Sequence, residues 1–198
     1  SQTKFSEGIN YRSQIKIELS GGDAVFTDIP VSLLDKFPTS TKFDSKIVLP
    51  SNLTVGLSAK HVKENWSLEF AYDMQSIGWS SYDSLNFDFE NAETPDSKTF
   101  QNWENVIIHR FGVDFTYKEK YSFRVGAYYD QDPMQEDRVS PHLPGGDHLA
   151  YTLGLGYQLN KMIAIGFAYI RKDVESETSL VDANFSAKYK TIANIYSI

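Results

Sequence analysis

The sequence predicts an all-β fold, a transmembrane antiparallel up-and-down β-barrel, and three observations support this prediction. Polar and apolar residues alternate with a period of two in eight segments of about ten residues, which is typical of strands with one polar and one apolar face. The connections between these segments are alternately long and short, as in outer-membrane barrels. Aromatic residues make up 14% of the 198 residues although the mean hydropathy is only −0.38, and a membrane strand needs an apolar side chain only at every second position.

The alternation supports the first four predicted strands in turn. Each has a run of apolar residues on one face and polar or small residues on the other. The apolar positions are Ile9, Tyr11, Ile15, Ile17 and Leu19 in 9–19, Leu53, Val55, Leu57 and Ala59 in 52–61, Trp66, Leu68, Phe70, Tyr72 and Met74 in 66–75, and Phe111, Val113, Phe115 and Tyr117 in 110–117.

The last four predicted strands follow the same pattern. The segment 184–198 alternates less cleanly, and we expect a bulge near Tyr189 to Thr191. The apolar positions of the others are Phe123, Val125, Ala127 and Tyr129 in 121–130, Tyr151, Leu153, Leu155 and Tyr157 in 150–158, and Ile163, Ile165, Phe167 and Tyr169 in 163–169.

The connections predict an orientation. The long ones lie at about 20–49, 76–102, 131–147 and 173–183, and the short ones lie at 63–65, 118–120 and 160–161. Outer-membrane barrels have short periplasmic turns and long extracellular loops. We therefore predict that the four long connections are extracellular and that both chain ends lie on the short-turn side.

The polar faces carry glycines, which would be of little use on a face that meets water. A face that lines a confined lumen does need small residues, because they leave room for a ligand or for long neighbouring side chains. The polar-face glycines are Gly56, Gly112, Gly126, Gly154, Gly156 and Gly166. Tyrosine and tryptophan near the strand ends fit the aromatic girdles of a membrane barrel.

Composition and motifs disfavour other functions. The chain has no cysteine, which excludes disulfides and a cysteine nucleophile, and its net charge of −7 disfavours nucleic acid. No apolar run approaches the ~20 residues of a spanning helix, and the first residues of the sequence predict no signal peptide. Ser140, Pro141 and His142 form no recognised nucleophile motif, and His142, Asp147 and His148 match no metal-ligand spacing. We therefore predict no catalytic residue and no metal site.

Charged residues on the polar face have two interpretations, because buried charges must be paired. They form an internal salt-bridge network, or an arginine binds an anionic head group through its planar donor fork. Arg110 and Arg124 lie on strands joined by the turn 118–120, offset by about four residues or ~13 Å. One can bind a ligand while the other pairs with Asp114 or Asp130, and we expect Arg110, nearer the outside, to contact the ligand. The full set is Arg12, Lys16, Glu18, Glu69, Asp73, Arg110, Asp114, Arg124 and Asp130.

Several strings, taken in order along almost the whole chain, resemble a known family. They begin with Leu49-Pro50 and Trp66. They continue with Trp79-Ser80-Ser81-Tyr82-Asp83-Ser84-Leu85, Asn102-Trp103 with Arg110-Phe111-Gly112, Phe123-Arg124-Val125-Gly126-Ala127-Tyr128-Tyr129-Asp130-Gln131-Asp132-Pro133, and Asp147-His148 leading into Tyr151-Thr152-Leu153-Gly154-Leu155-Gly156-Tyr157. Together they resemble the FadL family of outer-membrane channels for long-chain fatty acids and other hydrophobic compounds, the outer membrane protein transport family.

The resemblance implies a fourteen-stranded barrel, of which this chain is similar to the last eight strands, as one barrel segment over 1–198. The family's amino-terminal hatch and first six strands have no counterpart in it. The resemblance also implies a non-enzymatic monomer of the bacterial outer membrane that takes up hydrophobic small molecules passively through its lumen, is surrounded by outer-membrane lipid, and uses no cofactor and no nucleic acid. Two alternatives remain at this point, a structural or adhesive outer-membrane barrel whose long loops bind a partner, and a soluble β-sandwich binding module.

Overall fold

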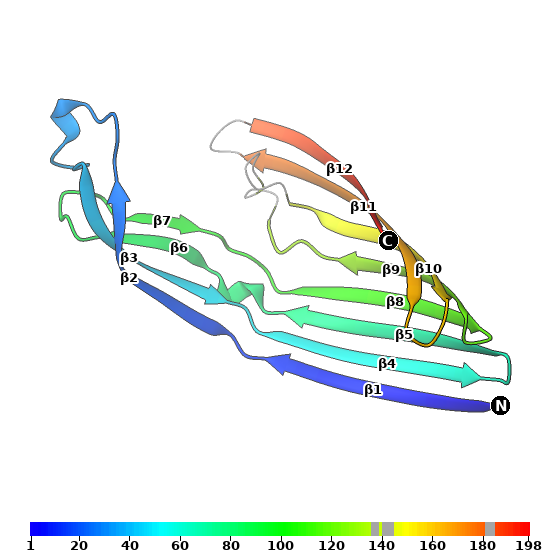
Figure 1. Ribbon diagram of the computed structural model, residues 1–198. Coiled ribbons are helices and arrows are strands. Elements are labelled where there is room, and N and C mark those ends of the chain that lie inside the picture. Colours follow the sequence, from blue (N-terminus) through cyan, green and yellow to red (C-terminus); the bar gives the residue numbers. More distant parts are fainter. Residues whose placement is uncertain (136–138, 140–144, 181–184) are drawn as a thin grey trace.

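The computed structural model of the chain describes residues 1–135, 139, 145–180 and 185–198. The strands form two antiparallel sheets, one of eight strands and one of four (Figure 1). The described residues also include two single-turn 3-10 helices, η1 (Val31–Leu33) and η2 (Trp79–Ser81). No helix in this described part has both the length and the apolar character needed to cross a membrane.

The larger sheet is curved and open, and its strands follow one another in chain order (Figure 1). Every neighbouring pair is antiparallel, as predicted for an up-and-down arrangement. In spatial order the strands are β1 (Gln2–Arg12), β4 (Asn52–Val62), β5 (Trp66–Ile77), β8 (Val106–Tyr117), β9 (Tyr121–Asp130), β10 (Asp147–Gln158), β11 (Ala164–Leu180) and β12 (Phe185–Ser197).

The smaller sheet extends one half of the larger sheet beyond its long-connection end (Figure 1). Its strands, in spatial order, are β2 (Ile15–Val25), β3 (Ser40–Leu49), β6 (Ser84–Phe89) and β7 (Ser97–Phe100). Along the chain, β1 runs into β2, β3 into β4, β5 into β6 and β7 into β8. The order β2-β3-β6-β7 therefore repeats the order β1-β4-β5-β8 of the strands that it continues.

The breaks between the two sheets lie next to one another. Pro50, which has no N–H group to donate to a ladder, separates β3 from β4. Gly78 separates β5 from η2, and its amide donates a hydrogen bond to the carbonyl of Ser51 at 2.9 Å. Asn102, with φ of 49°, follows β7. The interruptions of adjacent strands are thus at one level.

Phenylalanine side chains pack on one face of the smaller sheet. The ring centroids of Phe43 and Phe87 are 5.3 Å apart. Gly22 makes room for Phe43, because a Cβ at Gly22 would lie 2.7 Å from that ring. Gly21 has φ of 68°, and the register between β2 and β3 shifts between Leu19 and Gly22. The glycines therefore allow a bulge under a packed aromatic ring.

The structure corrects several predicted boundaries. The predicted strand 9–19 is wrong in extent, because the chain breaks at Ser13 and Gln14 and its two halves belong to different sheets. The predicted connections 20–49 and 76–102 contain the strands of the smaller sheet. The predicted connection 173–183 is also wrong, because β11 runs to Leu180.

The strand register confirms the predicted alternation in the larger sheet. Apolar side chains pair with apolar side chains across strands, as Leu57 does with Tyr72 and Tyr72 does with Phe111. We call this side the apolar face and the opposite side the polar face. Apolar-face side chains are exposed, for example 60% at Phe111 and 55% at Leu57. The bulge expected near Tyr189 to Thr191 is wrong, since β11 and β12 pair without any shift of register.

The predicted tight turn at 118–120 is confirmed and has a specific backbone geometry. Lys118 and Glu119 have φ of 52° and 53°. Positive φ at two successive residues is the type I′ geometry, which matches the twist of paired strands. The Lys120 amide donates to the Tyr117 carbonyl at 3.0 Å, which closes the turn. A hydrogen bond with the Tyr157 side chain raises the pKa of Lys120 above its ordinary value.

Replacing Glu119 by glycine is expected to stabilise the protein by about 0.5–1 kcal/mol, because glycine adopts positive φ without a Cβ clash. Urea unfolding of the protein in lipid vesicles measures this difference. Glu64→Gly is the matched control, since Glu64 lies in the turn 63–65 and has no positive φ. This control is expected to destabilise, so a gain of equal size in both variants would contradict the explanation.

Buried apolar residues lie at the long-connection end of the polar face. Val106, Ile108 and Ala150 are 3%, 6% and 0% exposed. The connection between β9 and β10 is fixed beside them, since the Glu104 amide donates to the Pro133 carbonyl at 2.9 Å. The described part of this connection therefore lies against the start of β8, where the polar face is covered.

Candidate functional site

The polar face carries ion pairs that cross between neighbouring strands of the larger sheet. The charged side chains are between 33% and 55% exposed, so they remain accessible to small molecules. At this exposure each pair stabilises the fold by about 1 kcal/mol or less. The pairs are Lys60–Glu69 at 3.4 Å, Arg110–Asp73 at 2.7 Å and Arg124–Asp114 at 2.5 Å.

Arg110 is held at both ends of its guanidinium group. The register places it opposite Asp73 on β5. Its Nη1 donates to Asp73 Oδ1 at 2.7 Å and its Nη2 donates to Gln75 Oε1 at 2.6 Å. These two bonds fix the side chain against β5 and use one N–H group of each terminal nitrogen.

Arg124 is held at one point only. Its Nε donates to Asp114 Oδ2 at 2.5 Å, and its terminal nitrogens form no hydrogen bond within the described residues. The side chain lies over two glycines of β10, because a Cβ at Gly154 would be 3.3 Å from Arg124 Cβ and a Cβ at Gly156 would be 3.6 Å from Nη1. These glycines give the side chain room, as predicted for small residues on the polar face.

The two arginines stand at different heights, with small residues between them. Arg110 pairs with Tyr128 across β8 and β9, whereas Arg124 pairs with Asp114, so the offset is the predicted four residues. Between these levels, one row of small residues crosses six strands, so the polar face carries no bulky side chain along this row. The row consists of Ser6, Ser58, Ala71, Gly112, Gly126 and Thr152.

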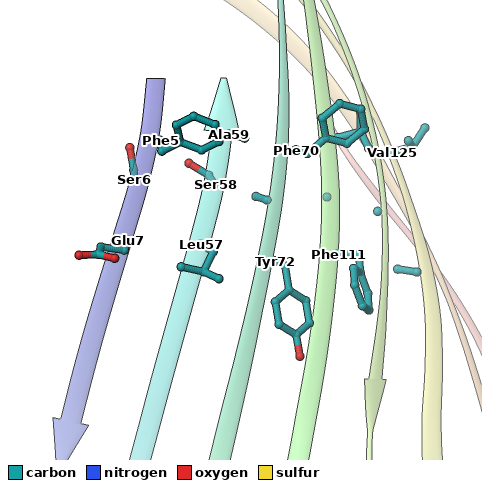
Figure 2. Close-up of a pocket in the computed structure, with 15 residues that line it drawn as sticks. Phe5, Ser6, Glu7, Leu57, Ser58, Ala59, Phe70, Tyr72, Phe111 and Val125 are labelled. Atoms are coloured by element: carbon teal, nitrogen blue, oxygen red, sulfur yellow. The ribbon is translucent and has the colours of Figure 1, made fainter. Parts of the chain in front are cut away.

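A groove of about 780 Å³ crosses the apolar face at the same level. Figure 2 shows Phe5 and Phe70 on one side of it and Leu57, Tyr72 and Phe111 on the other. The groove arises because the residues between these rows point to the polar face and are small. It is therefore a feature of the apolar surface and lies apart from the arginines.

Residues 2–198 match the family of outer membrane protein transport proteins (OMPP1/FadL/TodX). The chain belongs to the FadL family. Its FadL-family relatives include the long-chain fatty acid transport proteins of Escherichia coli, at 24% identity over 181 residues, and of Salmonella typhi, at 22% identity over 173 residues. Each alignment covers 82% of this chain and 38% of the relative, so the chain spans well under half of their length.

A solved structure of the FadL family shares the fold. The crystal structure of a Pseudomonas aeruginosa FadL homologue superimposes with a TM-score of 0.70 at 19% identity. The superposition covers 96% of this chain and 46% of the homologue. It confirms the predicted fold class, an antiparallel barrel segment, although the described sheet is open.

Membership of the FadL family confirms the predicted location in the bacterial outer membrane. The apolar face of the larger sheet then meets lipid and the polar face lines the lumen, because a membrane barrel turns its apolar residues outward. This location sets aside the soluble β-sandwich. The family consists of transport proteins rather than enzymes.

The residues weighed for catalysis or metal binding do not form a site in the described structure. Residues 140–142 lie outside the described residues. The Tyr129 hydroxyl donates a hydrogen bond to Asp147, and His148 Nδ1 lies 3.6 Å from the Asp130 carboxylate. Within the described ranges, no three potential ligand side chains gather around one point.

Some charged residues lie where the sequence predicts, whereas the contacts of others do not follow from it. Of the two partners expected for the paired arginine, Asp114 or Asp130, the structure shows Asp114 bound to Arg124, whereas the contacts of Arg110 with Asp73 and Gln75 were not foreseen. Lys16 and Glu18 belong to β2, so their predicted place beside the lumen charges of the larger sheet is wrong. Alternation shows which face a residue occupies, but register across a long connection is needed to find its partner.

Proposed function

We propose that this chain forms part of the wall of a passive uptake channel, through whose lumen hydrophobic compounds such as long-chain fatty acids cross the outer membrane. The proposal is supported by membership of the family and by relatives named as long-chain fatty acid transport proteins. The protein acts as a monomer in this proposal and needs no cofactor.

The observation that supports a binding role is that, in the part of the chain that the structure describes, the terminal nitrogens of one lumen arginine are hydrogen-bonded and those of the other are not. Arg110 uses one N–H group of each terminal nitrogen for Asp73 and Gln75. Arg124 is 55% exposed, and its terminal nitrogens make no bond among the described residues. A carboxylate head group binds best to a guanidinium that offers two parallel N–H groups. We therefore propose Arg124 as the head-group contact and Arg110 as a pairing residue that holds β8 to β5, which departs from the expectation that favoured Arg110.

Arg124→Ala is expected to weaken binding of a long-chain fatty acid about tenfold, since a hydrogen bond to a charged group contributes roughly 1.5–3 kcal/mol. The methyl ester of the same acid carries no charge, so its affinity should change less than about twofold. Equilibrium binding to the protein expressed from its native gene and purified in detergent gives both constants. Arg124→Lys, which keeps the charge but loses the planar fork, should fall between the two proteins.

Arg110→Ala is the matched variant on the neighbouring strand. It should affect the acid and the ester alike, because its loss frees Asp73 without removing a ligand contact. A selective loss of acid binding in Arg110→Ala, with none in Arg124→Ala, would reverse the assignment. Failure of the protein to bind or take up either ligand would contradict the channel function and favour a structural or adhesive barrel.

A further inference from the structure

The outward side of the β11–β12 hairpin changes from apolar to charged residues partway along its length. From the short-turn end, the apolar-face positions of β11 are Ile165, Phe167 and Tyr169, and Tyr169 packs on Tyr196 of β12 with ring centroids 5.1 Å apart. The next four positions on the same side are all charged. They are Arg171, Asp173, Glu175 and Glu177.

The opposite side of the hairpin carries fewer charges at the same level. Beyond Ile170 it carries Lys172, Val174 and Ser176 on β11, which pair with Ala193, Thr191 and Tyr189 on β12. The outward side of β11 is thus apolar up to Tyr169 and charged beyond it, and the outward positions of β12 that pair with the charged ones are Asn194, Ile192, Lys190 and Lys188. Such a change on the outward side is expected where the surroundings of the wall change from hydrocarbon to a polar layer, and the paired tyrosines lie where an aromatic girdle is expected.

The charged residues of both strands form a ladder of ion pairs, which we call the outward ladder. Arg171 Nε lies 3.2 Å from Asp173 Oδ2, Lys190 pairs with Glu175, and Lys188 Nζ lies 3.0 Å from Glu177 Oε2. The cations remain open to the surroundings, with exposures of 47% at Arg171, 62% at Lys190 and 79% at Lys188. Each pair uses only one donor of its cation, so each cation keeps further donors for a ligand.

We propose that the outward ladder binds the phosphate groups of the phosphorylated glycolipid in the outer leaflet, with Arg171, Lys188 and Lys190 as donors. The proposal goes beyond uptake and uses the predicted orientation, in which the long-connection end is extracellular. Guanidinium and ammonium groups bind phosphate through charge-assisted hydrogen bonds. The carboxylates of the ladder hold these cations in an ordered row.

The length of the ladder indicates a glycolipid rather than a phospholipid. Glu177 lies eight residues beyond Tyr169, which corresponds to about 27 Å along the strand and, at a strand tilt of about 40°, to about 20 Å along the membrane normal. A phospholipid head-group layer is only about 5–8 Å thick on each side of a bilayer, so it would reach Arg171 and little more. A lipid that carries phosphates on a thick sugar layer reaches Lys190 and Lys188 as well.

Native mass spectrometry of the protein, expressed from its native gene and extracted from an outer membrane, tests the proposal with added bis-phosphorylated lipid A that carries its inner core sugars and phosphates. The variant Arg171→Gln/Lys188→Gln/Lys190→Gln is expected to bind this lipid about tenfold less tightly than the unchanged protein. Asp173→Asn/Glu175→Gln/Glu177→Gln keeps the three cations and should bind at least as tightly. It also shows that loss of the ion pairs themselves is not what weakens binding.

Lys172→Gln is the matched single control, because Lys172 neighbours Arg171 but lies on the opposite side of β11. Its affinity should equal that of the unchanged protein. Undiminished binding by the triple cation variant would overturn the proposal, as would equal binding of dephosphorylated glycolipid. Equal binding of phosphatidylglycerol would overturn the choice of glycolipid, because it would show that a single phosphate near the bilayer surface suffices.

Discussion

Replacing Leu155 by arginine is expected to destabilise the protein by roughly 2–4 kcal/mol, the cost of a cationic side chain on the lipid face of a barrel near the bilayer midplane. Leu155 is 51% exposed on the apolar face, and its partners on both neighbouring strands are phenylalanines, Phe123 and Phe167. Unfolding in urea with the protein in lipid vesicles measures the loss.

Ala168→Arg is the control for this substitution. Ala168 lies on β11 next to Phe167 but on the polar face, where it pairs with Gly154. An arginine there meets a small residue and the aqueous lumen, so the cost should be clearly smaller. Equal costs at Leu155 and Ala168 would contradict the assignment of the two faces.

Whole-cell labelling is expected to give nearly all-or-none results for the two ends of the barrel. Gln135 lies in the long connection after β9, and Glu119 lies in the turn at 118–120; both are exposed. Since these 198 residues contain no cysteine, a single cysteine at either position reports on that site alone within this chain. With the long connections outside, an impermeant thiol reagent should label Gln135→Cys on intact cells and should leave Glu119→Cys unlabelled.

Labelling after the outer membrane is permeabilised provides the control, because both variants should then react. Labelling of Glu119→Cys and protection of Gln135→Cys on intact cells would reverse the orientation. That result would also place the outward ladder on the periplasmic side, away from the glycolipid.

The sequence was sufficient to predict faces and local register, because both depend on short-range geometry. A period of two decides which face each residue occupies, so Arg110 and Arg124 were placed together on the polar face. The three-residue turn at 118–120 fixes how β8 and β9 pair, so the contact of Arg124 with Asp114 follows from counting. The same counting gives the offset between the two arginines.

Contacts across long connections did not follow from the sequence. Asp73 and Arg110 are separated by the whole excursion through β6 and β7, and no count along the chain can give the register of β5 against β8. The smaller sheet was missed for a related reason. β6 and β7 are short, and β2 contains a shift of register. Alternation also continues from Tyr11 to Ile17 across the break at Ser13 and Gln14, so one period describes two strands in different sheets.

Four adjacent strands are interrupted at one level, so a shift of register in the smaller sheet does not reach the membrane part of the wall. In an unbroken ladder, one inserted residue would turn every later side chain to the opposite face. Here the bulge between Leu19 and Gly22 adds such an irregularity to the smaller sheet, yet β1 and β4 pair without a shift from Gln2 to Arg12. Insertions and deletions can therefore accumulate in the outer extension during evolution while the lipid-facing sequence keeps its phase.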